Sequence, residues 1–359
     1  MKLFEKIKVR QEKEIRFLGV PILQYGNKEL SGFKEKYLNL FPKRSFRKDF
    51  FEYIIANLDK KYENIIFYEH HIGEFVIFLQ LFNLIVKKYK LNDYVLIIGS
   101  QKFADLINLF GLEINYKVIK VDYYRMFDMF KEREIYNYKK MKFILFQSDN
   151  YLDFRVRLAN GEKINFYKYI CECFHLDKKN VPSIKFCPNL VLENSVKENV
   201  NRCNLNLDKF IIINPFAQSV EPLSIDFWQA LINCLVENGY DVYLNSSNPG
   251  RYKNVKCIYL RLDEVALLST YAKAIISLRS GLDDLLILAN RPMHVVFTPL
   301  NGIKEKNSKY TLTGYSLKNL PFGNSNIFEY KFQNDESVIL KQILRNIDLE
   351  VFDAKCNVK

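Results

Sequence analysis

Short apolar runs alternate with longer segments of helical spacing, and this alternation occurs in two separate series along the 359 residues. An unbroken apolar run of four or five residues is typical of a strand buried on both faces. Strands that alternate with helices predict parallel sheets covered by helices. In the first series the predicted strands are 65–68, 94–98, 117–121 and 143–146, with helices that end at Lys90 and Phe110. The 60 residues before it are basic and irregular, apart from a short strand at 19–23 and a helix at 43–59.

The second series begins after an irregular stretch, residues 150–205, in which we place the domain boundary. Ser224 has the character of a helix N-cap and Gly239 that of a helix stop, so a helix is expected between them. Asp263 is expected to cap another helix, which ends at Lys273. The predicted strands are 210–213, 241–244, 257–260, 274–278 and 294–297, with further helices at 281–289 and 335–350.

Basic residues outnumber acidic ones, with 53 Lys and Arg against 41 Asp and Glu, a net charge of +12. Such a surplus favours anionic partners, for example nucleotide phosphates, acidic glycans or lipid headgroups. The lysines are scattered along the chain and do not form a stripe, so a nucleic-acid-binding surface is not predicted.

The chain shows none of the usual signs of export, membrane insertion or structural zinc. Residues 1–16 are charged throughout, unlike a signal peptide. The longest apolar run, 75–86, has 12 residues, whereas a membrane span needs about 20. The seven cysteines include no C-x-x-C pair, which argues against a zinc or redox motif and fits a reducing compartment. We therefore expect a cytoplasmic protein whose contact with the inner face of the cytoplasmic membrane is at most peripheral.

The second half resembles the donor domain of the heptosyltransferase-like glycosyltransferases, which have the GT-B fold. The matching segments follow one another in the family's order and spacing over about 90 residues: 211–217 (IIINPFA), 227–231 (FWQAL), 239–244 (GYDVYL), 278–285 (LRSGLDDL), and 289–292 (ANRP) followed by 295–297 (VVF). The resemblance of the first half rests on Ile72-Gly73-Glu74, which precedes a long apolar helix.

The resemblance implies an α/β protein with two facing Rossmann-like domains and a cleft between them. Residues 1–200 would bind the acceptor, and residues 201–335 the nucleotide-sugar. A C-terminal helix and tail, 336–359, could pack back on the N-terminal domain. The implied enzyme is a hexosyl- or heptosyl-type glycosyltransferase that acts on a bacterial surface glycan, such as lipopolysaccharide or capsule. Its partners would be the nucleotide-sugar and a glycan or glycolipid acceptor, without nucleic acid; transfer would invert the anomeric centre, without a cofactor or a metal.

The predicted diphosphate site is the turn that follows the 274–278 strand. Parallel sheets bind ligands at the carboxyl ends of their strands, and the free N–H groups at a helix N-terminus hold phosphate. Ser280 and Gly281 open the predicted helix that continues with Leu282, and Gly281 permits close approach because it has no Cβ. Arg279 adds a cation suited to bidentate pairing with phosphate. The alternative is that Ser280 only caps the helix and that Arg279 pairs with a surface acid.

This region also departs from the family's pattern. The family has an acidic residue at the position of Arg279 and a His near Asp284. Its Lys after the first strand of the donor domain is missing, since Glu221 and Pro222 occupy that region. These departures argue against carrying over heptose as the sugar. Asp283 and Asp284 are neighbours on the predicted helix and do not share a face, so we expect one to contact sugar hydroxyls and the other to face solvent.

Two further strand ends carry polar residues that could contact the donor. One group follows the 210–213 strand and the other follows the 241–244 strand, where the carboxyl edge of the sheet is expected. Residues of these types are also ordinary turn formers, so both interpretations stay open. The candidates are Asn214, Ala217, Gln218 and Ser219 in the first group, and Asn245 and Ser246 in the second.

Inverting transfer to a hydroxyl needs a base close to the anomeric carbon. In the resembled family the base is an Asp that follows a Gly, and here Glu74 follows Gly73. An acid in the first turn of a helix is also favoured by the helix dipole, without any catalytic role. His70 and His71 precede Glu74, and either could orient it, act as the base or bind an acidic acceptor. No third ligand at metal spacing accompanies the two histidines, so no metal site is expected.

Two alternative functions stay open at this point. Another nucleotide-sugar enzyme of the GT-B fold, an epimerase or a hydrolase, would turn over the donor without an acceptor. A non-catalytic member would bind nucleotide or glycan tightly, and Glu74→Gln would change nothing.

Overall fold

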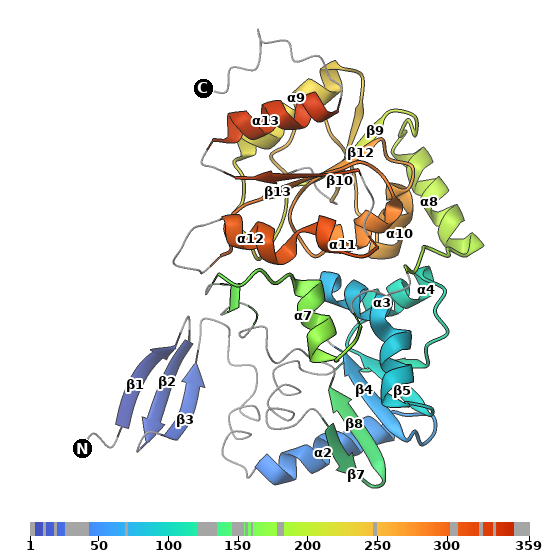
Figure 1. The fold of residues 1–359 in the computed structure, drawn as a ribbon, viewed down its shortest axis with the longest axis vertical. Coiled ribbons are helices and arrows are strands. Elements are labelled where there is room, and N and C mark those ends of the chain that lie inside the picture. The colour runs from blue at the N-terminus through green and yellow to red at the C-terminus, as the bar shows by residue number, and fades with distance from the viewer. Residues whose placement is uncertain are drawn as a thin grey trace.

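Two α/β halves are stacked along the long axis of the molecule, with a small separate sheet beside the first half (Figure 1). The small sheet is an antiparallel meander of β1 (Phe4–Val9), β2 (Glu12–Phe17) and β3 (Val20–Tyr25). The computed structural model describes residues 4–9, 12–17, 20–25, 43–68, 71–120, 135–145, 154, 157–158, 161–177, 183–246, 250–301, 308–322, 326–332 and 335–347.

The first half is built on a five-stranded sheet of order β6-β5-β4-β8-β7. All its pairs are parallel except the one between β7 and β8. β4 is buried along its whole length, as expected of an unbroken apolar run. The strands are β4 (Asn64–Tyr68), β5 (Tyr94–Ile98), β6 (Tyr116–Val118), β7 (Ile135–Tyr138) and β8 (Met141–Leu145), and the helices are α2 (Lys43–Ala56), α3 (Ile72–Tyr89), α4 (Gln101–Leu109) and α7 (Phe166–Cys173).

The second half is a six-stranded, fully parallel sheet of order β11-β10-β9-β12-β13-β14. Its two central strands, β9 and β12, are buried throughout. The strands are β9 (Phe210–Asn214), β10 (Asp241–Asn245), β11 (Lys256–Ile258), β12 (Ala274–Leu278), β13 (Met293–Phe297) and β14 (Ile327–Lys331). The helices are α8 (Leu190–Arg202), α9 (Ile225–Glu237), α10 (Leu262–Ser269), α11 (Asp283–Leu286), α12 (Ser308–Tyr315) and α13 (Glu336–Asn346), with short 3-10 turns at Ile287–Ala289 and Leu317–Asn319.

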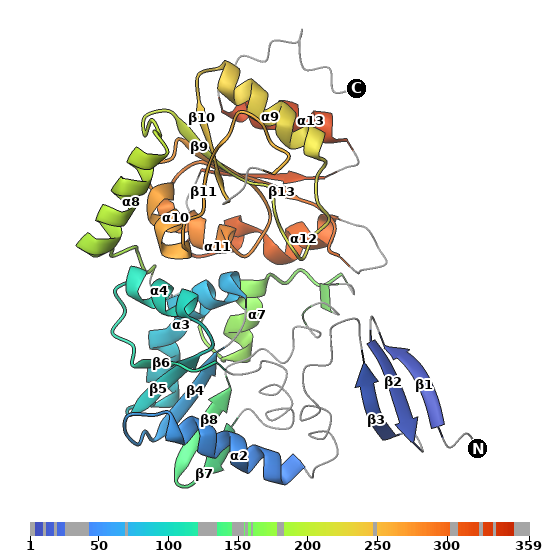
Figure 2. The same cartoon turned by 180° about the vertical axis from the view of Figure 1, so that it is seen from behind.

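The two halves face each other through helices. α10, α11 and α12 of the second half lie opposite α3, α4 and α7 of the first (Figures 1 and 2). One buried apolar cluster runs through both halves, because it contains Phe75 and Leu106 of the first together with Val265 and Leu285 of the second. A second cluster lies under α9 and α13, and a third lies under α2. The halves therefore share their central core.

Most of the predicted strands and helices are confirmed, with differences in the less regular segments. The described residues between Phe4 and Tyr25 form three strands where a single short strand was expected. α8 lies within the stretch predicted to be irregular, and it packs against α10. Ser224 caps α9 as predicted, since its Oγ accepts from the Phe227 N–H at 3.0 Å. Asp263 does not cap α10, because Arg261 takes the N-cap position and Asp263 lies in the first turn.

The C-terminal helix packs within the second half, where α13 contacts α9. The rest of the expected tail, 348–359, lies outside the described residues. The buried α13 residues Ile339, Leu340 and Ile343 belong to the apolar cluster under α9, because α13 follows β14 at the edge of the second sheet. None of the described helices is both long enough and apolar enough to cross a bilayer.

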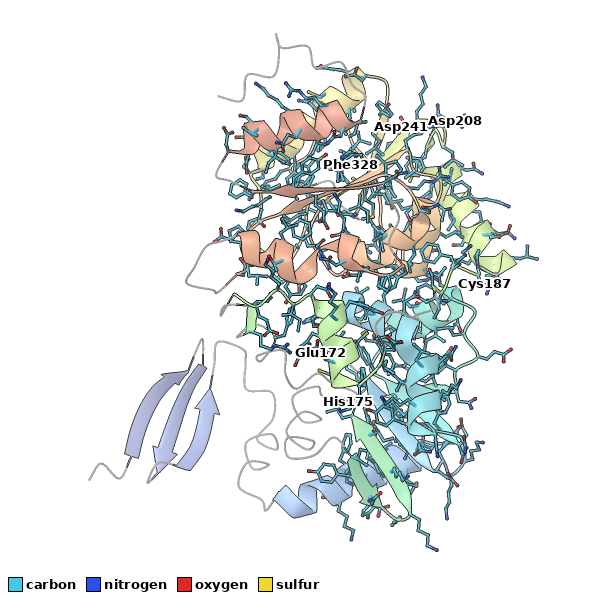
Figure 3. All side chains as sticks on the ribbon, in the orientation of Figure 1. Glu172, His175, Cys187, Asp208, Asp241 and Phe328 are labelled. Carbon is cyan, nitrogen blue, oxygen red and sulfur yellow. The ribbon has the colours of Figure 1, made fainter. Side chains whose placement is uncertain are left out.

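A buried histidine in the second sheet makes the stability depend on pH. His294 is 1% exposed, stacks against Phe328 (labelled in Figure 3) with ring centroids 4.8 Å apart, and lies with Nδ1 2.8 Å from the Tyr330 hydroxyl. Burial lowers the pKa of His294 to about 4, below the ordinary value of about 6.5. Between pH 4 and pH 6.5, His294 is therefore protonated in the unfolded chain but stays neutral in the folded protein.

We expect neutral His294 to contribute fully to the free energy of unfolding above pH 6.5. As the pH falls toward 4, this free energy should decrease by up to about 3 kcal/mol. Urea unfolding at pH 7 and pH 5 measures it when the wild type is compared with His294→Gln. The variant should have the shallower pH dependence, whereas His175→Gln, which replaces an exposed histidine, should leave it unchanged. Equal pH dependence in the wild type and His294→Gln would contradict the assignment.

Candidate functional site

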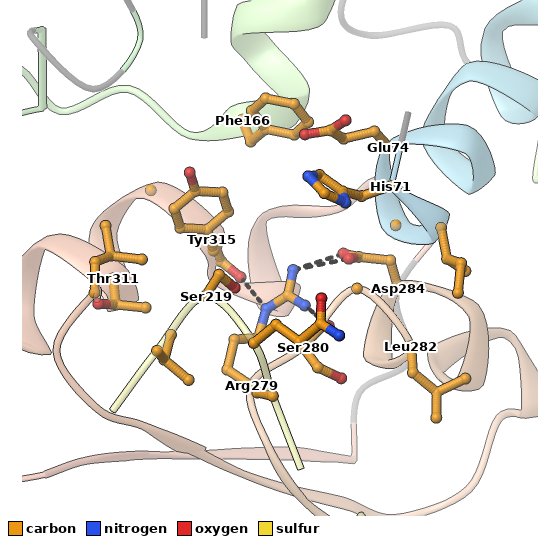
Figure 4. A pocket seen from close by; sticks show the side chains of 18 of the residues that line it. His71, Glu74, Phe166, Ser219, Arg279, Ser280, Leu282, Asp284, Thr311 and Tyr315 are labelled. Atoms are coloured by element: carbon orange, nitrogen blue, oxygen red, sulfur yellow. Dashed lines mark hydrogen bonds and ion pairs between the residues drawn. The ribbon is translucent and has the colours of Figure 1, made fainter. Parts of the chain in front are cut away.

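A cavity of about 680 Å³ lies between the two halves. Its walls come from the first turn of α3 and the start of α7 on one side, and from the loops after β9 and β12 together with α12 on the other (Figure 4). It brings together many of the predicted site residues: His71, Glu74, Ala217, Gln218, Ser219, Arg279, Ser280, Gly281, Leu282 and Asp284.

The predicted base residues lie on the first-half side of this cavity. His71 occupies the N-cap position of α3 with an extended backbone, and Glu74 lies in the first turn of that helix. Figure 4 shows both side chains reaching into the cavity, with the Glu74 carboxylate beside Phe166 and the His71 ring between Glu74 and Arg279. His70 lies outside the described residues.

The loop after β9 forms part of the opposite wall. Asn301 holds it in place, because its Nδ2 donates to the carbonyls of Gln218 and Val220, each at 2.9 Å. The backbone N–H of Asn301 also donates to the Ser219 carbonyl at 2.9 Å. Asn214 does not line the cavity: it is 7% exposed at the end of β9, and its Nδ2 has no hydrogen-bond partner among the described residues. Residues 217–219 are therefore a fixed wall for a ligand.

Arg279 lies in the cavity wall, but its charge is already paired. The side chain is 8% exposed, and Nη2 donates to both carboxylate oxygens of Asp284 at 2.7 and 3.0 Å. Nε donates to the Tyr315 carbonyl at 3.0 Å, and Nη1 donates to the Ser280 carbonyl. The sequence predicted that Arg279 would pair with a diphosphate or with a surface acid, but its partner is the buried Asp284. A ligand phosphate that bound Nη2 would have to compete with Asp284 for it.

The expectation that one of the two adjacent aspartates faces solvent is wrong. Asp283 is 0% and Asp284 is 4% exposed, because α11 is short and lies between the sheet and α3. Asp283 does not line the cavity; its Oδ2 accepts from the Ser280 N–H at 2.7 Å and so closes the turn. Burial raises the pKa of Asp283 to about 6. Burial also raises the pKa of Asp284, while Arg279 opposes that shift.

Gly281 was expected to allow close approach of a diphosphate, but it lies directly against Gly73 of the first half. A Cβ on Gly281 would lie 2.9 Å from the Gly73 backbone N, and a Cβ on Gly73 would lie 2.9 Å from the Gly281 Cα. Real Cβ atoms essentially never come so close to other heavy atoms. The two glycines therefore let the first turn of α3 rest directly on the turn after β12. The helix expected at 281–289 is the four-residue α11 followed by a 3-10 turn, so it offers a shorter N-terminus than predicted.

Asn245 and Ser246 are not among the cavity residues. The Asn245 side chain binds the backbone of Leu260, accepting from its N–H at 2.7 Å and donating to its carbonyl at 3.2 Å. Asn245 therefore joins β10 to the segment after β11. Its strand lies two places away from β12, on the far side of β9.

Other cavity residues were not predicted. Asn165, Phe166 and Tyr167 come from the start of α7, where the Asn165 side chain accepts from the Lys168 N–H at 2.8 Å. This N-cap arrangement was the available signal in the sequence. Thr311 and Tyr315 of α12 and Lys102 of α4 are further lining residues that were not predicted. Within the part of the chain that the structure describes, no group of three or more His, Cys, Asp or Glu side chains could hold a metal ion.

Comparison with known proteins identifies the fold. No protein-family model and no curated protein sequence matches the chain. Among solved structures, ADP-heptose lps heptosyltransferase II of E. coli matches with a TM-score of 0.52 and 11% identity, over 80% of this chain and 97% of that one. A glycosyl transferase family 9 protein of Veillonella parvula DSM 2008 matches with a TM-score of 0.51 and 10% identity, over 81% and 98%.

The chain has the GT-B fold. The predicted fold class is thereby confirmed. In this GT-B protein the cavity lies between the two α/β halves, at the carboxyl ends of the central strands β9 and β12, where parallel sheets bind ligands.

Proposed function

We propose that the protein is a glycosyltransferase that moves a sugar from a nucleotide-sugar donor to a bacterial surface glycan or glycolipid, such as lipopolysaccharide or capsule. The proposal rests on one observation: Glu74 and His71 of the first half line the same cavity as residues 217–219 and 279–282 of the second half. Two substrates that enter from different halves would meet there. The resemblance to structures of glycosyltransferases supports this reading.

The reaction that this arrangement would perform is a displacement at the anomeric carbon. Glu74 takes the proton of the acceptor hydroxyl, and the oxygen attacks the anomeric carbon from the face opposite the leaving group. The bond from that carbon to the diphosphate oxygen breaks, and the nucleoside diphosphate leaves with the electron pair. The configuration at the anomeric carbon is therefore inverted. His71, between Glu74 and Arg279 in Figure 4, would orient Glu74 or an acidic acceptor.

The donor would lie against the second half. Residues 217–219 and Gly281 line the cavity on that side, and their backbone N–H groups would bind phosphate oxygens, whereas the Ser280 N–H is already bound to Asp283. The sugar would then face Glu74 across the cavity. We further propose that the protein works in the cytoplasm, with its net charge of +12 favouring an anionic acceptor at the inner membrane surface.

A thermal-shift screen with UDP, GDP, ADP, CMP and their sugars tests the donor part of the proposal. A ligand that binds only the folded protein raises the midpoint by mass action. At a hundredfold excess over its Kd, the true nucleotide should raise the midpoint by about 3–5 °C. Flat curves for every nucleotide and every sugar would contradict the proposal. Donor turnover without an acceptor would favour an epimerase or a hydrolase instead.

We also propose that transfer needs no metal ion. Activity with the donor found in the screen is therefore expected to be the same in excess EDTA as in its absence, since the charge of the leaving group would be met by protein groups. An activity that disappears in EDTA and returns with Mg²⁺ or Mn²⁺ would show that this part of the proposal is wrong.

A further inference from the structure

The pair between Arg279 and Asp284 occupies a position that an anionic ligand would also favour. The Arg279 guanidinium lies in the cavity wall. Its Nη2 donates to both carboxylate oxygens of Asp284, at 2.7 and 3.0 Å. The other guanidinium nitrogens are bound to the carbonyls of Tyr315 and Ser280, which fix its plane. The cation is thus preorganised, and the bound anion is a side chain of the same protein.

Asp284 also lies against the first turn of α3, which belongs to the other half. A Cβ built on Gly73 would be 2.2 Å from Asp284 Oδ2. The 18-residue α3 has His71 at its N-cap position. A negative charge at a helix N-terminus is favoured by the helix dipole. The Asp284 carboxylate therefore gains from two positive sources, one in each half.

The charges of the cavity wall balance before any ligand enters. The described lining residues include two carboxylates, Glu74 and Asp284, and two cations, Lys102 and Arg279. Burial raises the pKa of Asp284, and the negative charge of Glu74 acts in the same direction. A singly charged ligand that displaced Asp284 would only exchange one anion for another. A diphosphate brings more charge and more acceptor oxygens to the same guanidinium.

We propose that Asp284 is a specificity-determining residue, whose carboxylate competes with the ligand for Arg279 so that the cavity binds diphosphates and rejects singly charged anions. This inference rests on the proposed function, because it assigns the group of the donor that reaches Arg279. Asp284 makes binding depend on the charge of the ligand, and it does not itself contact the diphosphate.

Calorimetric titration with inorganic pyrophosphate and with acetate tests the inference. Asp284→Asn removes the carboxylate that is hydrogen-bonded to Arg279 and leaves only the Asp283 carboxylate, 3.9 Å from Nη1, so the buried cation is less well compensated and an incoming anion relieves that state. This variant should bind pyrophosphate about tenfold more tightly than the wild type, or better, and should also bind acetate, which the wild type should not. Arg279→Gln should abolish pyrophosphate binding. Asp263→Asn, which removes the carboxylate of another Arg–Asp pair outside the cavity, should behave as the wild type does.

Asp284→Ser gives the same comparison if Asp284→Asn does not fold. Unchanged or weaker pyrophosphate binding in the folded variant would overturn the inference, because it would show that Asp284 helps the ligand or ignores it. The absence of pyrophosphate binding in both proteins would overturn it as well. Neither result bears on the thermal-shift screen with whole nucleotides, so a failure of the inference and a failure of the proposed function can be told apart.

Discussion

Replacing Glu74 with Gln is expected to lower the turnover number by about 10²–10⁴-fold, the contribution typical of a positioned base. The amide has almost the same size as the carboxylate but cannot take the proton of the acceptor hydroxyl. Binding of the donor should change little, since Glu74 lies on the first-half side of the cavity, away from residues 217–219. Turnover and donor affinity are measured separately, with the donor found by thermal shift.

His71→Gln, tested in parallel, decides between the two candidate bases within the described residues. The larger loss is expected in Glu74→Gln. Glu237→Gln, on the exposed face of α9, serves as the matched control and should keep full turnover. If Glu74→Gln retains more than half of the wild-type turnover while His71→Gln does not, the histidine is the base. Tight nucleotide binding without any measurable transfer in the wild type would instead favour a non-catalytic role.

Replacing Gly73 with Ala should disturb the contact between the halves. The new methyl group would lie 2.2 Å from Asp284 Oδ2 and 2.9 Å from the Gly281 Cα, so the first turn of α3 must move. We expect a loss of about 1–3 kcal/mol in the free energy of unfolding, as overpacking usually costs. A displacement of about 1 Å can also lower turnover by about 100-fold. Urea unfolding and turnover measure the two effects.

The contact can be tested from both sides. Gly281→Ala places a methyl group 2.9 Å from the Gly73 backbone N, so it should have a similar effect. The double variant should lose less than the sum of the two, because both changes open the same contact. Gly314→Ala is a useful comparison for the free energy of unfolding: its methyl group would meet side-chain ends, Leu158 Cδ1 at 2.6 Å and Phe154 Cζ at 3.2 Å, instead of backbone, and should cost less. Full additivity of Gly73→Ala and Gly281→Ala would contradict a shared contact.

Most of the fold could be predicted because its strands are buried. β4 and β9 contain the unbroken apolar runs 65–68 and 210–213, and β12 is apolar except for Ser277, so burial of both faces leaves few alternatives for these segments. Segments with mixed composition gave no such signal. α8 was missed because only two of its side chains, Leu192 and Val196, are buried, and a helix that rests on a small part of its surface has weak apolar periodicity.

The candidate site was predicted in position more than in detail. Residues 217–219 and 279–282 follow strands, so their place at the carboxyl edge follows from the parallel sheet. The order of the strands does not, and Asn245 therefore turned out to lie beyond β9 from the turn at Ser280. The pairing of Arg279 with Asp284 joins residues five apart across a turn, a spacing for which helix rules give no expectation.

The apolar cluster common to both sheets has a consequence for how a substrate gets in. Two domains joined by a small polar interface can move relative to each other at little cost. Here, separating the two halves would expose buried apolar side chains of both to water. Wide hinge opening is therefore unfavourable, and entry should depend on local displacement at the rim of the cavity. For the same reason the two halves should lose their structure together on heating, in a single cooperative transition.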